Sequence, residues 1–258
     1  MVASEGNWKR PEHKGHDPNA QAKDFPQETA LDLLAKHRIV RWRAALVPDE
    51  ARAWAASVEA AERHWTKDFG GDQFALGRAF YTHLETGRSR HYFREAAASD
   101  ALVERILPGM QARIRALYSE LVGAPVLPRS GWCGPGVHVF PEDGPVARTG
   151  GIIHFDTEGF EEIHHTANAA ALSLVVMLRP PEIGGELRVW GVDYAGDDAP
   201  ALPPGILPLD ASYEAGDALL FASRTLHQIR PFSGGGPRIS ITAHALQDPT
   251  TGAWTSWF

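Results

Sequence analysis

The chain has 258 residues, 43% of them hydrophobic, which is enough for one large β domain with helical additions. A formal net charge of −7 argues against non-specific nucleic-acid binding, because that activity needs a basic surface. The single cysteine, Cys133, excludes an intramolecular disulfide, and no apolar run is long enough to span a membrane. These features predict a cytoplasmic protein without a membrane or nucleic-acid partner.

The N-terminal region is polar and rich in Pro, Gly and Asn, so we expect residues 1–24 to form a flexible tail. A lid over a functional site is the alternative interpretation of this tail. Residues 25–258 are predicted to form a single domain. Within it, residues 25–125 supply helical support and an insertion, and residues 126–258 form the core.

Helical patterns dominate the first half of the predicted domain. A short helix is expected over residues 30–36, a strand over 39–42, and a second helix from Pro48, where acidic residues in the first turn suit the helix dipole. Residues 70–94 are expected to be irregular. Ser99-Asp100 is a candidate N-cap for a helix that reaches Gly123, and Pro108 should kink this helix or start another. The long helices should pack on the outside of the main sheet.

From Val126 the pattern changes to short strands separated by Gly/Pro turns. Strands are expected over residues 136–140, 152–155, 172–178, 184–190, 218–221, 228–231 and 239–245. Seven or eight short strands suit a double-sheet jelly roll of the cupin kind. The expected fold class is therefore mainly β with helices, in which N-terminal helices flank a double-stranded β-helix core.

Two stretches carry residues that suit a metal site. In the first, two apolar residues lead into His154-Phe155-Asp156, and side chains at i and i+2 of a strand point to one face. In the second, a strand ending at Phe221 precedes His227, and a Gly-rich turn then leads to Arg238-Ile239-Ser240. One carboxylate and two imidazoles form the facial triad of non-haem Fe(II) oxygenases.

This order of motifs resembles the Fe(II)/2-oxoglutarate-dependent dioxygenase superfamily over roughly residues 131–246. Within it, the layout is similar to that of enzymes that hydroxylate free amino acids or natural-product intermediates. The resemblance implies Fe(II) held by His154, Asp156 and His227, 2-oxoglutarate held by Arg238 and Ser240, and O₂ as co-substrate. The planar guanidinium of Arg238 suits a carboxylate bidentately, and Arg230 is the neighbouring candidate for the same role.

Several further residues are candidates for substrate binding. Thr242 and His244 continue the strand face of Arg238 and Ser240, although interior polar groups with structural partners are the alternative. Glu158 follows the His-x-Asp pair and is placed to meet a substrate amine. In the irregular segment, Arg88 and Arg90 are placed to meet an anionic substrate group, with a solvated loop as the alternative.

The function implied by the resemblance is hydroxylation of an unactivated C–H bond of a small molecule. Desaturation, epoxidation and cyclisation share every ligand and stay open. Related halogenases carry Gly or Ala in place of the carboxylate, so Asp156 favours hydroxylation. Two other classes are a non-catalytic cupin-like metal-binding protein and a zinc hydrolase, but neither needs the Arg-x-Ser motif. Substrate identity and oligomeric state are not indicated by the sequence.

Overall fold

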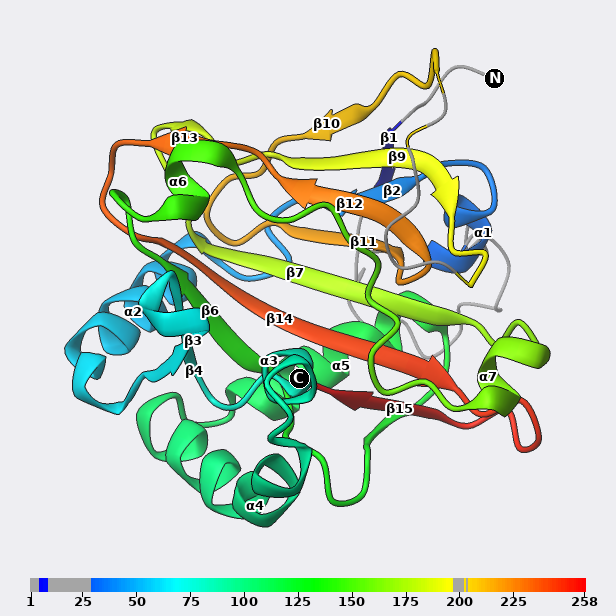
Figure 1. Ribbon diagram of the computed structural model, residues 1–258, viewed down its shortest axis with the longest axis horizontal. Coiled ribbons are helices and arrows are strands. Elements are labelled where there is room, and N and C mark those ends of the chain that lie inside the picture. The colour runs from blue at the N-terminus through cyan, green and yellow to red at the C-terminus, as the bar shows by residue number, and fades with distance from the viewer. Residues whose placement is uncertain (1–4, 9–28, 197–201, 203) are drawn as a thin grey trace, which may run out of the picture.

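The computed structural model describes residues 5–8, 29–196, 202 and 204–258. Its centre is one large, mainly antiparallel sheet (Figure 1). This sheet runs in the order β1 (Glu5–Trp8), β2 (Ile39–Trp42), β11 (Ala218–Ala222), β7 (Ala171–Arg179), β14 (Arg238–Gln247), β6 (Gly136–Phe140), β4 (Gln73–Leu76) and β3 (Thr66–Asp68). β15 (Trp254–Trp257) pairs with the second half of β14 and with β5 (Val126–Pro128).

A smaller sheet covers part of one face of the large sheet. It consists of β10 (Leu209–Ala211), β9 (Leu187–Asp193) and β12 (Thr225–Ile229), and a separate two-stranded ribbon joins β13 (Phe232–Ser233) to β8 (Ile183–Gly184). An apolar cluster fills the space between the two sheets and includes Met177 and Phe221 from the large sheet and Val189 from the small one. The arrangement is the jelly roll that the strand pattern predicted.

The long helices lie on the opposite face of the large sheet, as expected. They are α2 (Pro48–Ala60), α4 (Ser89–Ile106) and α5 (Met110–Val122), and the shorter helices are α1 (Ala30–Leu34), α3 (Phe80–Glu85), α6 (Pro145–Thr149) and α7 (Glu162–Thr166), with short 3-10 turns at η1 (Glu62–His64) and η2 (Phe69–Gly71). The main core joins α2, α4 and α5 to the outward side chains of β14, such as Ile239 and Ile241. Pro108 separates α4 from α5, so the predicted break is confirmed.

The expectation of an irregular segment over residues 70–94 is wrong. β4, α3 and the start of α4 lie within it, and β4 gains its place by pairing with β6, a distant partner that no local pattern reveals. The candidate N-cap at Ser99 is also wrong, because Ser99 is buried inside α4. This helix begins ten residues earlier, at Ser89, where Arg88 offers no side-chain cap and so no start signal.

Four residues of the predicted tail, Glu5–Trp8, form β1 and pair in parallel with β2. Residues 1–4 and 9–24 of this tail lie outside the described part of the chain. Five further short strands, β3, β5, β10, β13 and β15, were not predicted from the sequence. Within the described residues, no helix combines the length and apolarity needed to cross a bilayer.

Candidate metal and cofactor site

The segment that carries the His-x-Asp pair is not the continuous strand expected over residues 152–155. It makes a single bridge to β12, in which His154 N donates to His227 O at 3.1 Å and His227 N donates to His154 O at 3.0 Å. Phe155 is buried in a small apolar cluster on the other side of the segment. His154 and Asp156 therefore face one side, as predicted, and β12 brings His227 directly to them.

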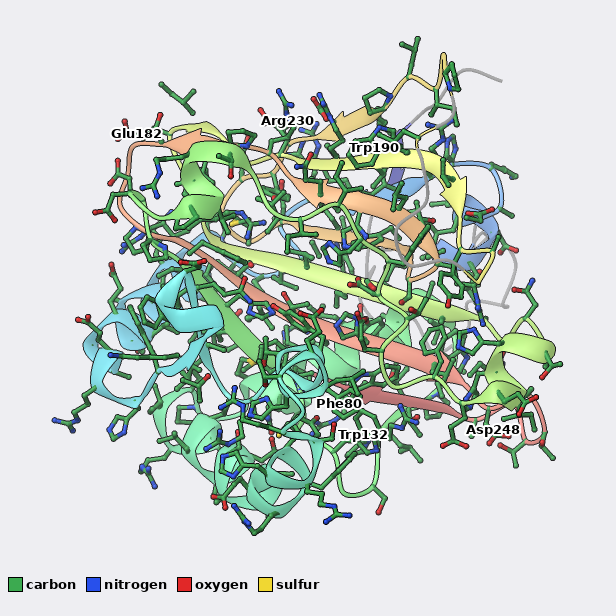
Figure 2. The ribbon with its side chains drawn as sticks, viewed as in Figure 1. Phe80, Trp132, Glu182, Trp190, Arg230 and Asp248 are labelled. Carbon is green, nitrogen blue, oxygen red and sulfur yellow. The ribbon has the colours of Figure 1, made fainter. Side chains whose placement is uncertain are left out.

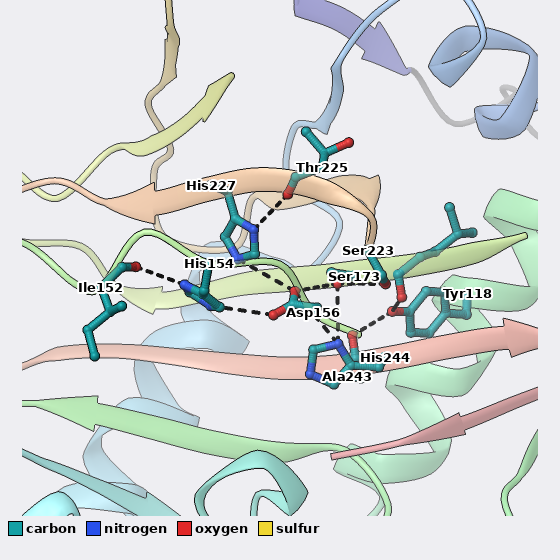
Figure 3. Close-up of polar contacts among 11 residues, drawn as sticks. Tyr118, Ile152, His154, Asp156, Ser173, Ser223, Thr225, His227, Ala243 and His244 are labelled. Carbon is teal, nitrogen blue, oxygen red and sulfur yellow. Dashed lines mark hydrogen bonds and ion pairs between the residues drawn. The ribbon is translucent and has the colours of Figure 1, made fainter. Parts of the chain in front are cut away.

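The three predicted metal ligands converge on one point at the edge of the interior (Figure 3). His154 Nε2 lies 3.5 Å from Asp156 Oδ1, and His227 Nε2 lies 3.5 Å from Asp156 Oδ2. One ligand atom from each residue lies within 4.8 Å of the other two. This spacing and this donor set fit a divalent metal ion with open coordination positions.

Backbone carbonyls orient both imidazoles. The Nδ1 atom of His154 lies 2.8 Å from Ile152 O, and that of His227 lies 3.0 Å from Thr225 O. A carbonyl can only accept, so each Nδ1 carries a hydrogen, and in the neutral form of each ring Nε2 keeps its lone pair free. Both rings are thus set in the tautomer that ligates a metal through Nε2.

The electrostatics of the triad also suit a cation. Burial alone would raise the pKa of Asp156, but the neighbouring His227 and His244 and the contact with His154 hold it well below its usual range. Burial lowers the pKa of His227 to about 4. Burial would also lower the pKa of His154, but its interactions with Asp156 outweigh this effect and raise it to about 9. The metal-free triad therefore holds a carboxylate and one proton that a metal ion would displace.

A polar cluster behind Asp156 fixes the orientation of its carboxylate. Ser173 Oγ donates to Asp156 Oδ2 at 2.5 Å and lies 2.9 Å from Ser223 Oγ. His244 Nδ1 lies 3.2 Å from Ser173 Oγ and 3.8 Å from Asp156 Oδ2. His244, predicted as a substrate contact, therefore lies beside the carboxylate ligand, and its ring packs on Trp257 with centroids 5.7 Å apart.

Arg238, the predicted cofactor anchor, is 1% exposed at the start of β14. Its guanidinium donates to Ser240 Oγ at 3.1 Å and to Tyr213 Oη at 2.5 Å, and Tyr213 Oη in turn donates to Gly185 O at 2.6 Å. No described carboxylate forms an ion pair with it, and its buried Nε has no hydrogen-bond partner. A buried cation without an anion is costly, so this arrangement fits a carboxylate brought by a ligand.

Strand alternation connects this anchor to the triad. Arg238, Ser240, Thr242 and His244 occupy alternate positions of β14, while the residues between them belong to the helix-side core. At one end of this row lies Arg238, and at the other end His244 is beside Asp156. The anchor and the metal ligands therefore share the interior side of the large sheet.

Arg230, the other candidate anchor, is unsuited to the role. Its side chain is 37% exposed, and its Nε lies 3.7 Å from Asp210 Oδ2, so it already has an anionic partner at the edge of the molecule (Figure 2). Arg88 and Arg90 are exposed at the start of α4, and no hydrogen bond or ion pair connects either to the triad within the described residues.

The loop after Asp156 carries the remaining candidate. Glu158 is half-buried, and burial, together with the nearby Asp156, raises its pKa to about 7. Arg129 holds this loop: it donates to Gly159 O at 2.8 Å, and its guanidinium lies 3.9 Å from the centroid of the Trp132 ring. Trp132 packs on Phe80 of α3, with centroids 4.4 Å apart (Figure 2).

Sequence reasoning missed three interior polar residues: Tyr213, Ser173 and His138. Ser173 and His138 each interrupt an apolar strand sequence, and this was the only available signal. Tyr213 lies before a turn, and its contact with Arg238 spans 25 positions, so nothing local indicates it.

Comparison with known proteins places the region that carries the triad and the anchor in a family. Residues 148–245 match the model of the 2OG-Fe(II) oxygenase superfamily. This segment belongs to the 2OG-Fe(II) oxygenase superfamily. Members of this superfamily use iron and 2-oxoglutarate, so the predicted cofactors are confirmed at that level.

Solved oxygenase structures share the fold. The epimerase SnoN, in complex with Fe3+, alpha ketoglutarate and nogalamycin RO, is 19% identical with a TM-score of 0.55, and the match covers 86% of this chain and 87% of that one. The carbocyclase SnoK from nogalamycin biosynthesis is 14% identical with a TM-score of 0.55, covering 86% and 84%. No curated protein sequence matches the chain. At these identities the two structures confirm the oxygenase fold class.

Proposed function

We propose that this oxygenase hydroxylates an unactivated C–H bond of a small molecule, either a free amino acid or a natural-product intermediate. The observation that carries the proposal is Arg238, a buried guanidinium without an acidic partner among the described residues, on the same interior side as the triad. 2-Oxoglutarate can bind at both places, because its distal carboxylate can pair with Arg238 and its 2-oxo acid group can bind a metal held by the triad.

The residues have distinct roles in this proposal. His154, Asp156 and His227 would hold Fe(II) through three protein ligands and leave the other positions of an octahedral ion open. With 2-oxoglutarate and O₂, the bound iron supplies an oxidation that yields succinate, CO₂ and the hydroxylated substrate. The task of the protein is to fix the positions of the reactants, which Ser173 supports by donating to Asp156.

Arg238 would orient the cofactor through its distal carboxylate. Ser240 and Tyr213 hold the guanidinium in place from two directions, so little side-chain freedom is lost when an anion binds. The burial of Arg238 keeps competing water away from this contact and strengthens it. Exposed Arg230 offers neither advantage.

The substrate is proposed to approach the triad from the side of the Asp156 loop. Glu158 on this loop, and Thr242 and His244 on β14, are the proposed contacts. Glu158 follows Asp156 by two residues, His244 lies beside Asp156, and Thr242 precedes His244 on the same face of β14. The proposal that Arg88 and Arg90 bind substrate has no such support, since both are exposed on α4.

Other reactions use the same ligands. SnoN is named an epimerase and SnoK a carbocyclase, so epimerisation and cyclisation join desaturation and epoxidation as alternatives for this chain. Asp156 argues against halogenation, because the carboxylate fills the position that an anion would need. A non-catalytic metal-binding protein or a zinc hydrolase would leave the unpaired charge of Arg238 without a purpose.

A substrate screen tests the proposal. Purified protein with Fe(II), 2-oxoglutarate and O₂ is incubated with amino acids and their derivatives, and succinate formation is measured. We expect one compound class to stimulate succinate formation and to gain one oxygen atom by mass spectrometry, while His227→Ala protein gives background only. If 2-oxoglutarate fails to bind the metal-loaded protein at all, the proposal is wrong.

A further inference from the structure

His138 is a buried histidine in the interior that neither the triad nor the anchor uses. It lies in the middle of β6, and the strand register places it opposite Ser240 of β14. Directly opposed residues of an antiparallel pair point to the same face, so His138 lies on the interior side with Arg238 and Ser240. The residue is 6% exposed.

Three aromatic rings hold the imidazole in position. The ring centroids of Phe258, Tyr81 and Phe140 lie 4.8, 5.7 and 5.7 Å from that of His138. Gly136 permits this packing, because a Cβ there would lie 2.1 Å from the Phe258 ring. An apolar residue would fill such surroundings at less cost in free energy than a polar ring. We therefore expect the imidazole to form a hydrogen bond that an apolar residue could not form.

Among the residues that the structure describes, the buried Nδ1 of His138 has no hydrogen-bond partner. A neutral imidazole carries its hydrogen on one nitrogen only, and a buried N–H without an acceptor is costlier than a bare lone pair. We therefore assign the hydrogen to Nε2. Nε2 is the imidazole nitrogen farther from the backbone, so a side chain on the interior side of β6 directs its Nε2–H group away from the strand.

His138 also lies within electrostatic reach of both ends of the site. Burial lowers its pKa to about 3, and His244 near the metal end and Arg238 at the anchor end contribute to this shift. The ring is therefore an uncharged donor under ordinary conditions. Such a donor binds an anionic oxygen without adding a second buried positive charge beside Arg238.

We propose that His138 donates a hydrogen bond from Nε2 to a carboxylate oxygen of the bound 2-oxo acid and so positions the cofactor between Arg238 and the metal ligands. This role rests on the proposed function. It predicts that removing the donor weakens cofactor binding and leaves metal binding largely intact, because no hydrogen bond or ring contact among the described residues joins His138 to the triad, whose charges reach it only through space.

The test compares His138→Phe with His138→Gln in the full chain. Phe fills the aromatic surroundings but has no donor, whereas Gln places an N–H group near the position of Nε2. The affinity for 2-oxoglutarate is measured anaerobically from the metal-to-ligand absorption band of the Fe(II) protein. We expect Phe to weaken it about tenfold, Gln to restore most of the loss, and Fe(II) affinity without 2-oxoglutarate to stay unchanged.

Tyr81→Phe is the matched control, because it keeps a ring against His138 but removes only the hydroxyl that accepts from Gln73. Its affinity for 2-oxoglutarate should equal that of the wild type. An unchanged affinity in His138→Phe, or equal losses in the Phe and Gln variants, would overturn the role of His138. If wild-type protein binds the cofactor and Arg238→Met does not, that outcome leaves the proposed function standing.

A second measurement does not depend on any variant folding. In ¹⁵N-labelled, Zn(II)-loaded wild-type protein, the His138 nitrogens should report a neutral ring with hydrogen on Nε2. Addition of 2-oxoglutarate should move the Nε2–H resonance downfield, as expected for a new bond to a carboxylate. Hydrogen on Nδ1, or an Nε2 signal indifferent to 2-oxoglutarate, would contradict the proposal.

Discussion

Arg41 and Arg238 are both buried arginines on strands of the large sheet, yet only Arg41 has a carboxylate partner. Arg41 Nε and Nη2 donate to Asp217 Oδ2 at 2.9 and 2.6 Å. Asp217 also accepts from the backbone nitrogens of Ala44 and Glu214, at 2.8 and 3.0 Å. Arg238 has two hydroxyl partners instead, Ser240 and Tyr213, and no acid among the described residues.

The difference separates a structural charge from a functional one. At Arg41 the fold supplies both members of an ion pair, so the charges are neutralised within the chain. At Arg238 the described residues supply two hydroxyl hydrogen bonds but no opposite charge, so they offset the cost of burying the cation only in part. We therefore propose that a bound anion offsets this cost at Arg238, whereas Arg41 already has its anion in Asp217.

The largest effect is expected at the metal ligands, because the proposed reaction needs both a bound metal and a 2-oxo acid that Arg238 holds next to it. His154→Ala or His227→Ala removes one of three ligands, so Fe(II) binding and turnover should be abolished while the fold survives. Metal content after reconstitution and circular dichroism measure the two outcomes. His165→Ala, an exposed histidine of α7, is the control. If either ligand variant retains activity, the assignment of these three residues as the metal ligands is wrong.

The second prediction tests the comparison through stability. Arg41→Met leaves the Asp217 carboxylate buried without its cation and should lower the free energy of unfolding by about 3–5 kcal/mol. Arg238→Met removes a charge that has no acidic partner in the described part of the chain, so the metal-free variant should be at least as stable as the wild type. Urea unfolding of both variants measures the difference. Equal destabilisation by the two substitutions would make Arg238 a structural residue.

The third prediction concerns cofactor affinity, for which Arg238 should matter more than Arg41, the reverse of their order for stability. Arg238→Met should weaken 2-oxoglutarate binding by about 2–5 kcal/mol, because a charge-assisted contact to a carboxylate is lost, and Fe(II) affinity should not change. In folded Arg41→Met protein the cofactor affinity should equal that of the wild type. Titration of the metal-to-ligand absorption band decides this. Should Arg238→Met bind the cofactor normally, the anchor lies elsewhere.

Much of this site was predictable because its signals are local. His-x-Asp spacing placed two ligands on one side even though the segment is a single bridge and not a strand. Alternation along β14 placed Arg238 and Ser240 on the interior face, since a ten-residue strand keeps its two faces distinct.

What escaped prediction depends on distant partners. β4 is defined by its pairing with β6, and the contact between Tyr213 and Arg238 closes across two sheets. No periodicity within either segment contains that information. The start of α4 was missed for another reason: the spacing of Tyr92, Ala96 and Val103 is helical, but no capping residue marks the beginning.

The fourth prediction concerns the pH dependence of metal affinity at the triad. Interaction with Asp156 raises the pKa of His154 to about 9 in the metal-free protein, so below that pH a metal must displace a proton. Metal affinity should therefore fall about tenfold for each pH unit below 9 and level off above it. Mn(II) binding measured from pH 7 to 9.5 tests this. A flat profile would show that His154 is neutral before the metal binds.

The smallest effect is expected when a free anion rescues a variant that lacks the carboxylate ligand. Asp156→Gly removes one ligand, so metal binding and most turnover should be lost, and the rescue should recover only a small part of the binding. The structure shows donors that would remain there: Ser173 Oγ, which faces Asp156 Oδ2 at 2.5 Å, and Ser223 Oγ beside it. These hydroxyls should hold formate or chloride weakly and restore a small part of Mn(II) binding, and Ser173→Ala in the same variant should remove that rescue.

The products of the same variant show whether Asp156 fills a metal position. Two neutral hydroxyls hold chloride poorly compared with a charged partner, so we expect little or no chlorinated product from Asp156→Gly, even at high chloride. The unmutated chain should give only oxygen-derived products under the same conditions, because its carboxylate excludes the anion. Mass spectrometry with and without chloride measures both. Substantial chlorination by the unmutated chain would mean that Asp156 does not ligate the metal, and the unpaired charge of Arg238 would then need a different ligand to explain it.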